Sequence, residues 1–134
     1  MTYTLLPPLP TRHTPDQILA EEQRWLRDCA HDGLPRAHLW QAPQCLIVTR
    51  KDMRLPRYQA ACEQLAAEGW PVHVRDSGGT AVPHGAGILN LSLLLPRTTT
   101  DLGHYYHLLG APLLALLGEY GLTGNYDFVP GSFC

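Results

Sequence analysis

The sequence predicts an α+β fold, in which a mixed β-sheet is flanked by helices. The predicted order is helix, two strands, helix, strand, glycine-rich turn, strand and helix. Strands that follow one another directly favour a mixed sheet with helices packed on it, rather than a regular doubly wound sheet. The length of 134 residues suits one domain, and a hydrophobic fraction of 45% is enough for a core. We therefore expect one domain over residues 1–134.

The first helix is predicted by its start and stop signals. After a proline-rich, extended lead-in at Pro7–Pro10, Thr14 suits the N-cap and Pro15 the first helical position. Apolar residues then recur at helical spacing as far as Cys29. We expect the helix to end near Gly33.

The middle of the chain predicts strands around a second helix. Residues 38–50 are expected to form two short strands separated at Pro43. A helix is predicted over residues 57–68 and is ended by Gly69. Residues 72–75 then alternate as a strand should.

The last third of the chain predicts one strand and one long helix. A glycine-rich turn leads into a strand over residues 87–95. Residues 102–120 are mostly helical in pattern, and Pro112 is expected to begin, kink or interrupt that helix. The tail, residues 121–134, shows turn chemistry and no clear element.

Charge and hydropathy exclude several classes of partner. The net charge is −2 and no continuous basic block is present, so neither nucleic acid nor a membrane surface is an expected partner. No stretch approaches the roughly 18 apolar residues of a membrane span. The first residues lack the pattern of a signal peptide, so the cytoplasm is the expected location.

The cysteines and histidines give no metal-site pattern. No CxxC pair occurs, and three cysteines lie among apolar residues and are expected to be small buried hydrophobes: Cys29, Cys45 and Cys62. His104 and His107 are three apart on the long helix and could share a metal. Because no carboxylate is in register with them, we interpret them as a polar helix face and predict no metal site.

The segment from residue 74 to residue 92, VRDSGGTAVPHGAGILNLS, carries most of the functional information. Gly78 and Gly79 lack a Cβ, which allows positive φ and lets a ligand lie against backbone N–H groups. Arg75 offers a planar fork for a carboxylate or phosphate. Further polar side chains follow: Thr80, His84, Asn90 and Ser92. The expected ligand is flat or narrow with an anionic or carbonyl head, and the alternative is a glycine-rich hairpin without a ligand.

Two common nucleotide motifs are absent. The chain has no GxxxxGK[ST], and the stretch from Gly85 to Asn90 lacks the third glycine of GxGxxG. A P-loop or Rossmann site is therefore disfavoured.

The same segment resembles the signature of lipoate-protein ligases, in which an arginine precedes SGGG-A-V, a histidine, a glycine and an asparagine. The matching positions are Arg75, Ser77, Gly78, Gly79, Ala81, Val82, His84, Gly87, Asn90 and Ser92. The stretch from His84 to Leu89 is also similar to the HGPG-x-L stretch of octanoyltransferases. A looser resemblance covers the rest, from the first helix (residues 19–23) to the GSFC ending at Cys134.

The resemblance implies the fold of a biotin/lipoate protein ligase catalytic domain and a set of binding residues. In that family the glycine pair and the following strand line a tunnel for the acyl chain, and the arginine holds the activated acyl head. The implied substrate-binding residues are Arg75, Ser77, Gly78, Gly79, Thr80, Ala81 and His84, with Asn90 in support. Thr80 replaces the third glycine of the ligase pattern. His84 could instead support the strand.

The resemblance also implies an activity. The first hypothesis is a lipoate-protein ligase-like enzyme, or the N-terminal fragment of one, that attaches lipoate through lipoyl-AMP to a lysine of a lipoyl carrier domain. Its substrates would be ATP, accompanied by Mg, and lipoate, without a tightly bound cofactor.

Two alternatives stay open. One is an octanoyl or lipoyl transferase that takes its group from a thioester, with acyl carrier protein as a possible donor. Cys134 would then be the acyl-accepting nucleophile, since thiolates suit thioester exchange, or else an unreactive cysteine. The other alternative, from a different class, is a non-catalytic module that binds the acyl chain or the carrier domain.

The resemblance finally implies a partial domain. Family members carry a lysine in a KxxG-A motif, whose charge offsets negative charge that develops during the reaction. The only lysine here is Lys51, which precedes the glycine turn and matches no such motif. We therefore expect a truncated domain that is inactive alone; the alternative is a natural short chain that only binds.

Overall fold

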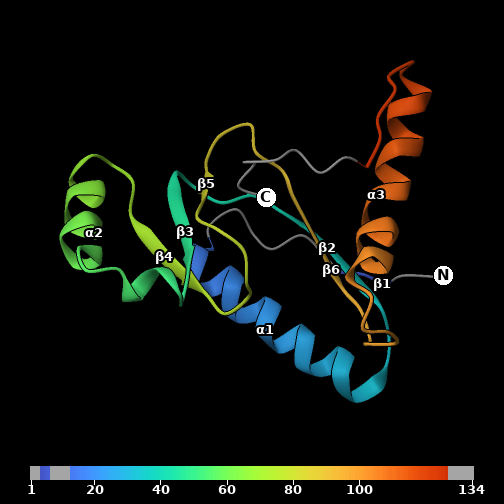
Figure 1. Cartoon of the computed structure of the whole chain (residues 1–134), viewed down its shortest axis with the longest axis horizontal. Helices are drawn as coiled ribbons and strands as arrows, with labels where there is room; N and C mark the ends of the chain where they lie inside the picture. The colour runs from blue at the N-terminus through green and yellow to red at the C-terminus, as the bar shows by residue number, and fades with distance from the viewer. Residues whose placement is uncertain (1–3, 7–12, 127–134) are drawn as a thin grey trace. The chain divides into compact units, whose positions relative to one another are not determined.

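The computed structural model describes residues 4–6 and 13–126. These residues form two compact units, one reaching to Leu95 and the other beginning at Pro96. The first unit contains two helices, a short 3-10 helix and six strands, and the second contains one helix (Figure 1). The predicted α+β class is confirmed.

Helix α1 spans Pro15–Asp32 and has the predicted ends. Thr14 Oγ1 accepts from Gln17 N at 3.3 Å while Gln17 Oε1 accepts from Thr14 N at 2.9 Å, a reciprocal capping box. Gly33 ends the helix with φ 70°, and its N–H donates to Cys29 O at 2.9 Å. A glycine suits this left-handed position because it has no Cβ to clash.

The strands divide between two three-stranded sheets, and each sheet is mixed. In the first sheet, a central strand pairs parallel with one neighbour and antiparallel with the other, in the order β1 (Thr4–Leu5), β2 (Arg36–Trp40), β6 (Asn90–Leu94). The second sheet has the same mixture, in the order β4 (Val72–Arg75), β3 (Cys45–Thr49), β5 (Val82–His84). The prediction of mixed pairing is thus confirmed, with two sheets in place of one.

Helix α1 packs on both sheets, because it contacts β4 of one and β6 of the other (Figure 1). Two small cores result. Trp25 and Cys29 of α1 pack with Leu94 of β6. In the second core, Leu19 of α1 packs against a buried group from the β3 region: Ala42, Cys45 and Ile47. A cavity can therefore form along the part of α1 that lies between these two cores.

The predicted second helix is present as α2, Tyr58–Ala67. A 3-10 helix η1 (Asp52–Arg54), absent from the sequence prediction, connects β3 to it. The Asp52 carboxylate accepts from Thr49 N at 2.8 Å and from Thr49 Oγ1 at 2.9 Å. These hydrogen bonds, with backbone bonds first, lower the pKa of Asp52.

Two strands differ from the prediction. Residues 82–84, expected to belong to the glycine-rich turn, form β5 with Pro83 at its centre. Proline is tolerated there because β5 is an edge strand, where a missing N–H costs no ladder bond. The strand expected over 87–95 is shorter, and Gly87 with φ 83° belongs to the preceding turn.

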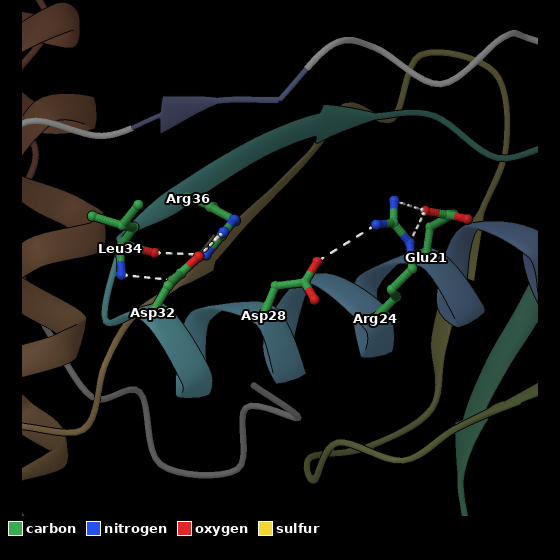
Figure 2. Close-up of polar contacts among 6 residues, drawn as sticks. All are labelled: Glu21, Arg24, Asp28, Asp32, Leu34 and Arg36. Atoms are coloured by element: carbon green, nitrogen blue, oxygen red, sulfur yellow. Dashed lines mark hydrogen bonds and ion pairs between the residues drawn. The ribbon is translucent and has the colours of Figure 1, made fainter.

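The corner between α1 and β2 is held by an arginine and an aspartate (Figure 2). Arg36 donates from Nη1 to Asp32 Oδ1 at 3.0 Å and from Nη2 to Asp32 Oδ2 at 2.5 Å. The Leu34 N–H also donates to Asp32 Oδ1 at 2.9 Å, and Leu34 O accepts from Arg36 Nη1 at 2.9 Å. The Arg36 hydrogen bond, followed by that from Leu34, lowers the pKa of Asp32 to about 2.

The second unit is built on α3, Leu102–Glu119, which begins at an Asp101 N-cap and continues through Pro112. Pro112 therefore neither begins nor interrupts the helix. Tyr126 packs back on α3: its hydroxyl donates to His107 O at 3.3 Å and its ring stacks at a tilt on that of His107. A Cβ on Gly110 would lie 2.3 Å from the Tyr126 ring, so this contact requires glycine.

Two of the predicted buried cysteines, Cys29 and Cys45, are buried, whereas Cys62 is half-buried. Within the described part of the chain, no helix is long and apolar enough to cross a membrane.

Candidate functional site

Arg75, the last residue of β4, folds over the glycine turn and holds it closed. Its Nη2 donates to Thr80 O at 2.8 Å and to Gly78 O at 3.1 Å, and its Nε donates to Gly78 O at 3.3 Å. The acceptors are neutral carbonyls, so the guanidinium charge is not cancelled by its hydrogen-bonded partners. The Arg75 guanidinium, which the sequence predicts to bind a ligand, thus also shapes the glycine turn that the ligand would contact.

The two glycines of the turn have different roles. Gly79 has φ 106°, and a Cβ there would lie 2.8 Å from Arg75 Nη2. Any other residue would therefore be strained and would push the guanidinium away. Gly78 has no positive φ, and a Cβ there would meet nothing within 4 Å. Its bare backbone is open to a ligand without being required by the fold.

Two cavities adjoin this turn. One, of about 270 Å³, is lined by α1, the two sheets and the turn: Leu19, Glu22, Trp40, Ile47, Arg75, Ser77, Gly78, Val82, His84, Asn90, Leu91 and Ser92. A second, of about 530 Å³, shares Leu19, Glu22, Arg75, Ser77 and Ser92 with the first and extends toward Arg50 and Met53. Together they reach the usual size of a small-molecule site, which is roughly 300–1,000 Å³.

A hydrogen-bonded chain of three side chains forms another part of the wall of the smaller cavity. Trp40 Nε1 donates to Ser92 Oγ at 2.9 Å, and the Ser92 hydroxyl donates to Glu22 Oε1. Asn90 supports the same wall, because its Nδ2 donates to Trp40 O at 3.3 Å. Burial raises the pKa of Glu22, partly offset by the hydrogen bonds from Ser92 and Trp40 and by the charge of Arg75.

His84 closes the smaller cavity. Its ring stacks on Trp40 with centroids 5.3 Å apart and an angle of 17° between the planes. Its Nδ1 is buried and has no hydrogen-bond partner among the described residues. Burial lowers the pKa of His84, and the charge of Arg75 lowers it further. The neutral imidazole stacked on the indole gives the cavity an aromatic surface. His84 Nδ1 is the buried polar atom of that ring that has no hydrogen-bond partner among the described residues.

The structure brings most of the predicted site residues together. Five of them line the smaller cavity: Arg75, Ser77, Gly78, His84 and Asn90. Gly79 and Thr80 belong to the turn that Arg75 holds. Ala81 lies elsewhere, in an apolar groove of about 250 Å³ that also includes α2 residues such as Ala61 and Leu65. Cys134, predicted as the nucleophile, lies outside the described residues.

The sequence placed Ser92 among the polar side chains that follow the glycine turn, but it assigned Glu22 and Trp40 no role beyond their helix and strand. Their relation depends on contacts between segments 52 and 70 residues apart, which no local pattern reveals.

The arrangement combines aromatic and aliphatic surfaces with polar side chains and one cation, Arg75, in the same cavity. The indole, imidazole and leucine surfaces suit an alkyl chain, and Arg75 suits a carboxylate, thioester carbonyl or phosphate. Among the described residues no group of three or more His, Cys, Asp or Glu could hold a metal ion.

Comparison with known proteins identifies a family. The model of the lipoyl protein ligase A/B catalytic domain matches residues 14–128. An octanoyl-[GcvH]:protein N-octanoyltransferase from Kyrpidia tusciae is 37% identical over 122 residues, covering 90% of this chain and 42% of the relative. A protein of the same name from Geobacillus kaustophilus is 34% identical over 97 residues, covering 71% of this chain and 34% of the relative. The chain thus spans less than half the length of these relatives.

Solved structures share the fold at lower identity. A lipoate-protein ligase from T. acidophilum with bound lipoic acid superposes with a TM-score of 0.76 at 20% identity, covering 98% of this chain and 53% of that one. Lipoate-protein ligase A bound with ATP gives a TM-score of 0.69 at 21% identity, covering 96% and 52%. The fold of the chain is that of about half of these structures.

Proposed function

The chain belongs to the lipoyl protein ligase A/B catalytic domain family, and we propose that it supplies the acyl-binding part of an enzyme that moves an octanoyl or lipoyl group onto a lysine of a lipoyl carrier domain. The acyl chain would occupy the smaller cavity, between Trp40 and the glycine turn. Its activated head would face Arg75. Because the chain spans about half of its structural neighbours, we expect it to bind the acyl group but not to turn over alone.

The observation that carries the proposal is the position of Arg75. It is the cation shared by both cavities, and its hydrogen bonds fix the glycine turn whose open face, at Gly78, borders the smaller one. A head group with a partial or full negative charge would be attracted to the Arg75 guanidinium, whose present hydrogen-bond acceptors are neutral carbonyls. The apolar wall of Trp40 and His84 lies in the same cavity, so one ligand can meet both.

Transfer from octanoyl-GcvH is the reaction we favour for the complete enzyme. The relatives with 34–37% identity are named octanoyl-[GcvH]:protein N-octanoyltransferases, a name in which octanoyl-GcvH is the donor and a second protein is the acceptor. Cys134, in the sequence Gly131-Ser132-Phe133-Cys134, would be the intermediate acceptor. Its thiolate would attack the amide carbonyl of the octanoyl-lysine on GcvH, the lysine amine would leave with a proton, and the octanoyl group would remain as a thioester on Cys134. A lysine of the second protein would then attack that thioester as a free amine and release Cys134.

The ligase reaction is the second candidate. It would use lipoate, ATP and magnesium, and Arg75 would meet the adenylate phosphate. The likeness of fold to an ATP-bound lipoate-protein ligase supports keeping it. A non-catalytic binding module is the third, and it predicts acyl binding with no covalent step.

Intact-mass measurement separates these candidates. The chain is mixed with octanoyl-GcvH in one arm, with and without an apo-E2 lipoyl domain, and with lipoate, ATP and magnesium in the other, with and without apo-GcvH; a complete family member is the positive control. An octanoyl adduct that disappears in Cys134→Ser but persists in Cys62→Ser supports the transferase. An adduct that persists in Cys134→Ser excludes Cys134 as the acceptor. Binding without an adduct supports the module, and modified GcvH in the ATP arm supports the ligase.

A further inference from the structure

A basic loop, residues 50–57, borders the larger cavity. It holds four of the ten cationic residues of the chain: Arg50, Lys51, Arg54 and Arg57. They alternate with apolar residues and one acid, which is why the sequence shows no continuous basic block. Met53 and Leu55, which lie between the cations, are 47% and 60% exposed.

Most of this charge is not neutralised within the protein. The acid inside the loop, Asp52, is turned toward the backbone N–H and hydroxyl of Thr49. Arg50 pairs with Asp76. Lys51, Arg54 and Arg57 are exposed, and in the described part of the chain no ion pair joins any of them to an acid. A concentrated, unpaired positive surface remains.

The loop is a fixed structure. Its 3-10 turn is closed by hydrogen bonds from Arg54 N to Lys51 O at 3.1 Å and from Leu55 N to Asp52 O at 3.0 Å. A further bond from Tyr58 N to Leu55 O, at 3.0 Å, joins it to α2. A surface that is already ordered loses little conformational entropy when a partner binds.

The position of the loop relates it to the site. Arg50 and Met53 line the larger cavity together with Arg75 and Ser77. This is expected from the topology, because β3 and β4 are parallel and both run toward this edge. Arg75 and Ser77 also line the smaller cavity, so a protein bound at this rim would lie next to the proposed acyl site.

The other part of the rim has a different electrostatic character. Helix α1 contributes residues such as Leu19 and Gln23 to the cavity. The neighbouring cation on α1, Arg24, is already paired with Glu21 at 2.6 Å and with Asp28 at 3.5 Å (Figure 2). The two sides of the rim therefore differ: Arg24 on α1 is paired with two carboxylates, whereas Lys51, Arg54 and Arg57 of the basic loop form no ion pair with the described residues.

We propose that the basic loop is the docking surface for an acidic face of the lipoyl carrier domain, with Met53 and Leu55 as apolar contacts among the charges. This inference rests on the proposed function, which requires a carrier to reach the cavity. Complementary charge raises the association rate and selects the orientation in which partners meet. The loop would thus bring the carrier's lysine over the larger cavity, beside Arg75, which also lines the smaller cavity proposed to hold the acyl chain.

The test compares two charge reversals of equal size. Arg54→Glu changes the basic loop, and Arg27→Glu changes an exposed arginine of α1 that lines neither cavity. The association rate of apo-GcvH with the 134-residue chain is measured at low and at physiological salt. Octanoate affinity is measured in parallel, and circular dichroism confirms that both variants fold.

We expect Arg54→Glu to slow association about tenfold at low salt and to weaken its salt dependence, while Arg27→Glu stays within about twofold. Octanoate affinity should be unchanged in both. Equal rates for the two variants, no association of GcvH with the wild type, or tighter binding of a DNA duplex than of GcvH would overturn the proposal. If octanoate failed to bind while GcvH still depended on Arg54, the docking surface would stand and the acyl-binding function would fall.

Discussion

Two arginines close turns at strand ends in this protein, and they differ in what they meet. Arg36, at the start of β2, is bidentate to the Asp32 carboxylate and also binds a carbonyl of its own turn. Arg75, at the end of β4, binds the carbonyls of Gly78 and Thr80. The charge of Arg36 is neutralised by the Asp32 carboxylate, with which it is in direct contact. The charge of Arg75 acts at longer range, where it lowers the pKa of His84 and opposes the rise in the pKa of Glu22.

The difference separates a structural arginine from one available to a ligand. A guanidinium already bound to a carboxylate gains little from a second anion, whereas one bound to neutral carbonyls keeps its attraction for negative charge. The same comparison explains the surroundings. Arg36 and Asp32 line none of the three cavities described above, whereas Arg75 lines two. The predictions below test this division between a corner that stabilises and a turn that binds.

The largest effect is expected from removing Arg75. In Arg75→Ala the turn loses three hydrogen bonds and the cavity loses its cation. We expect octanoate affinity, measured by calorimetry, to fall by about 10- to 100-fold, which corresponds to roughly 1.4–2.8 kcal/mol. The matched change Arg36→Ala should lower stability and leave affinity within about threefold. Equal losses of affinity in both variants would show that Arg75 acts only through the fold.

The two glycines of the turn provide the next test. Gly79→Ala should lower the free energy of unfolding by about 1–2 kcal/mol, because φ 106° is strained for alanine and its Cβ would displace Arg75. Gly78→Ala has neither problem and should change stability by less than about 0.5 kcal/mol. Its methyl group would nevertheless enter the cavity wall and weaken octanoate binding. Urea unfolding and calorimetry on both variants measure the two effects, and a Gly78→Ala protein with full affinity would place the ligand elsewhere.

The ion pair between Arg36 and Asp32 should make the stability of the protein depend on pH. The pKa of Asp32 lies below its ordinary value of 3.8, at about 2. Its contribution is therefore complete above about pH 4 and disappears as the pH falls through 2. Asp32→Asn should be less stable than the wild type at pH 7, and the difference should vanish near pH 2. Thermal unfolding across this range measures it; a difference that persisted at pH 2 would mean that packing, rather than charge, holds the corner.

The smallest effect is expected on the exposed face of α1. Arg24 pairs with Glu21 and Asp28, but the three side chains are 53%, 35% and 45% exposed. Such pairs are screened by water and salt, so Arg24→Ala should leave the thermal unfolding of the protein nearly unchanged. It should leave octanoate binding unaltered. A larger loss in thermal unfolding would mean that the ion-pair row of α1 stabilises the fold as the Arg36 corner does.

The sequence predicts best what local chemistry determines. The ends of α1 follow from Thr14, Pro15 and Gly33, and all three act within one turn of the helix. Strand β5 was missed because Pro83 resembles turn chemistry, and only its place at the sheet edge makes it acceptable. Strand β1 was missed because its two residues are ordered by pairing with β2, which is distant in sequence.

The same rule divides the candidate site. Arg75 and Gly78 were predicted because an arginine before a glycine pair is visible in a short window. Glu22 and Trp40 were not, because they meet through Ser92 only after α1 packs on the first sheet. The hydrogen bonds from Arg75 to the turn were also unforeseen, since they depend on how the turn folds back on β4.

The most direct test of the acyl-binding site uses the indole N–H signals of the three tryptophans in a heteronuclear NMR titration with octanoate. Trp40 donates its indole N–H to Ser92 in the cavity wall, whereas Trp70 lines neither of the two cavities beside the turn. A saturable shift of the Trp40 signal, absent at Trp70 and abolished by Arg75→Ala, is the predicted result. Saturable octanoate binding that left the Trp40 signal unmoved would contradict the assignment of this cavity as the acyl site.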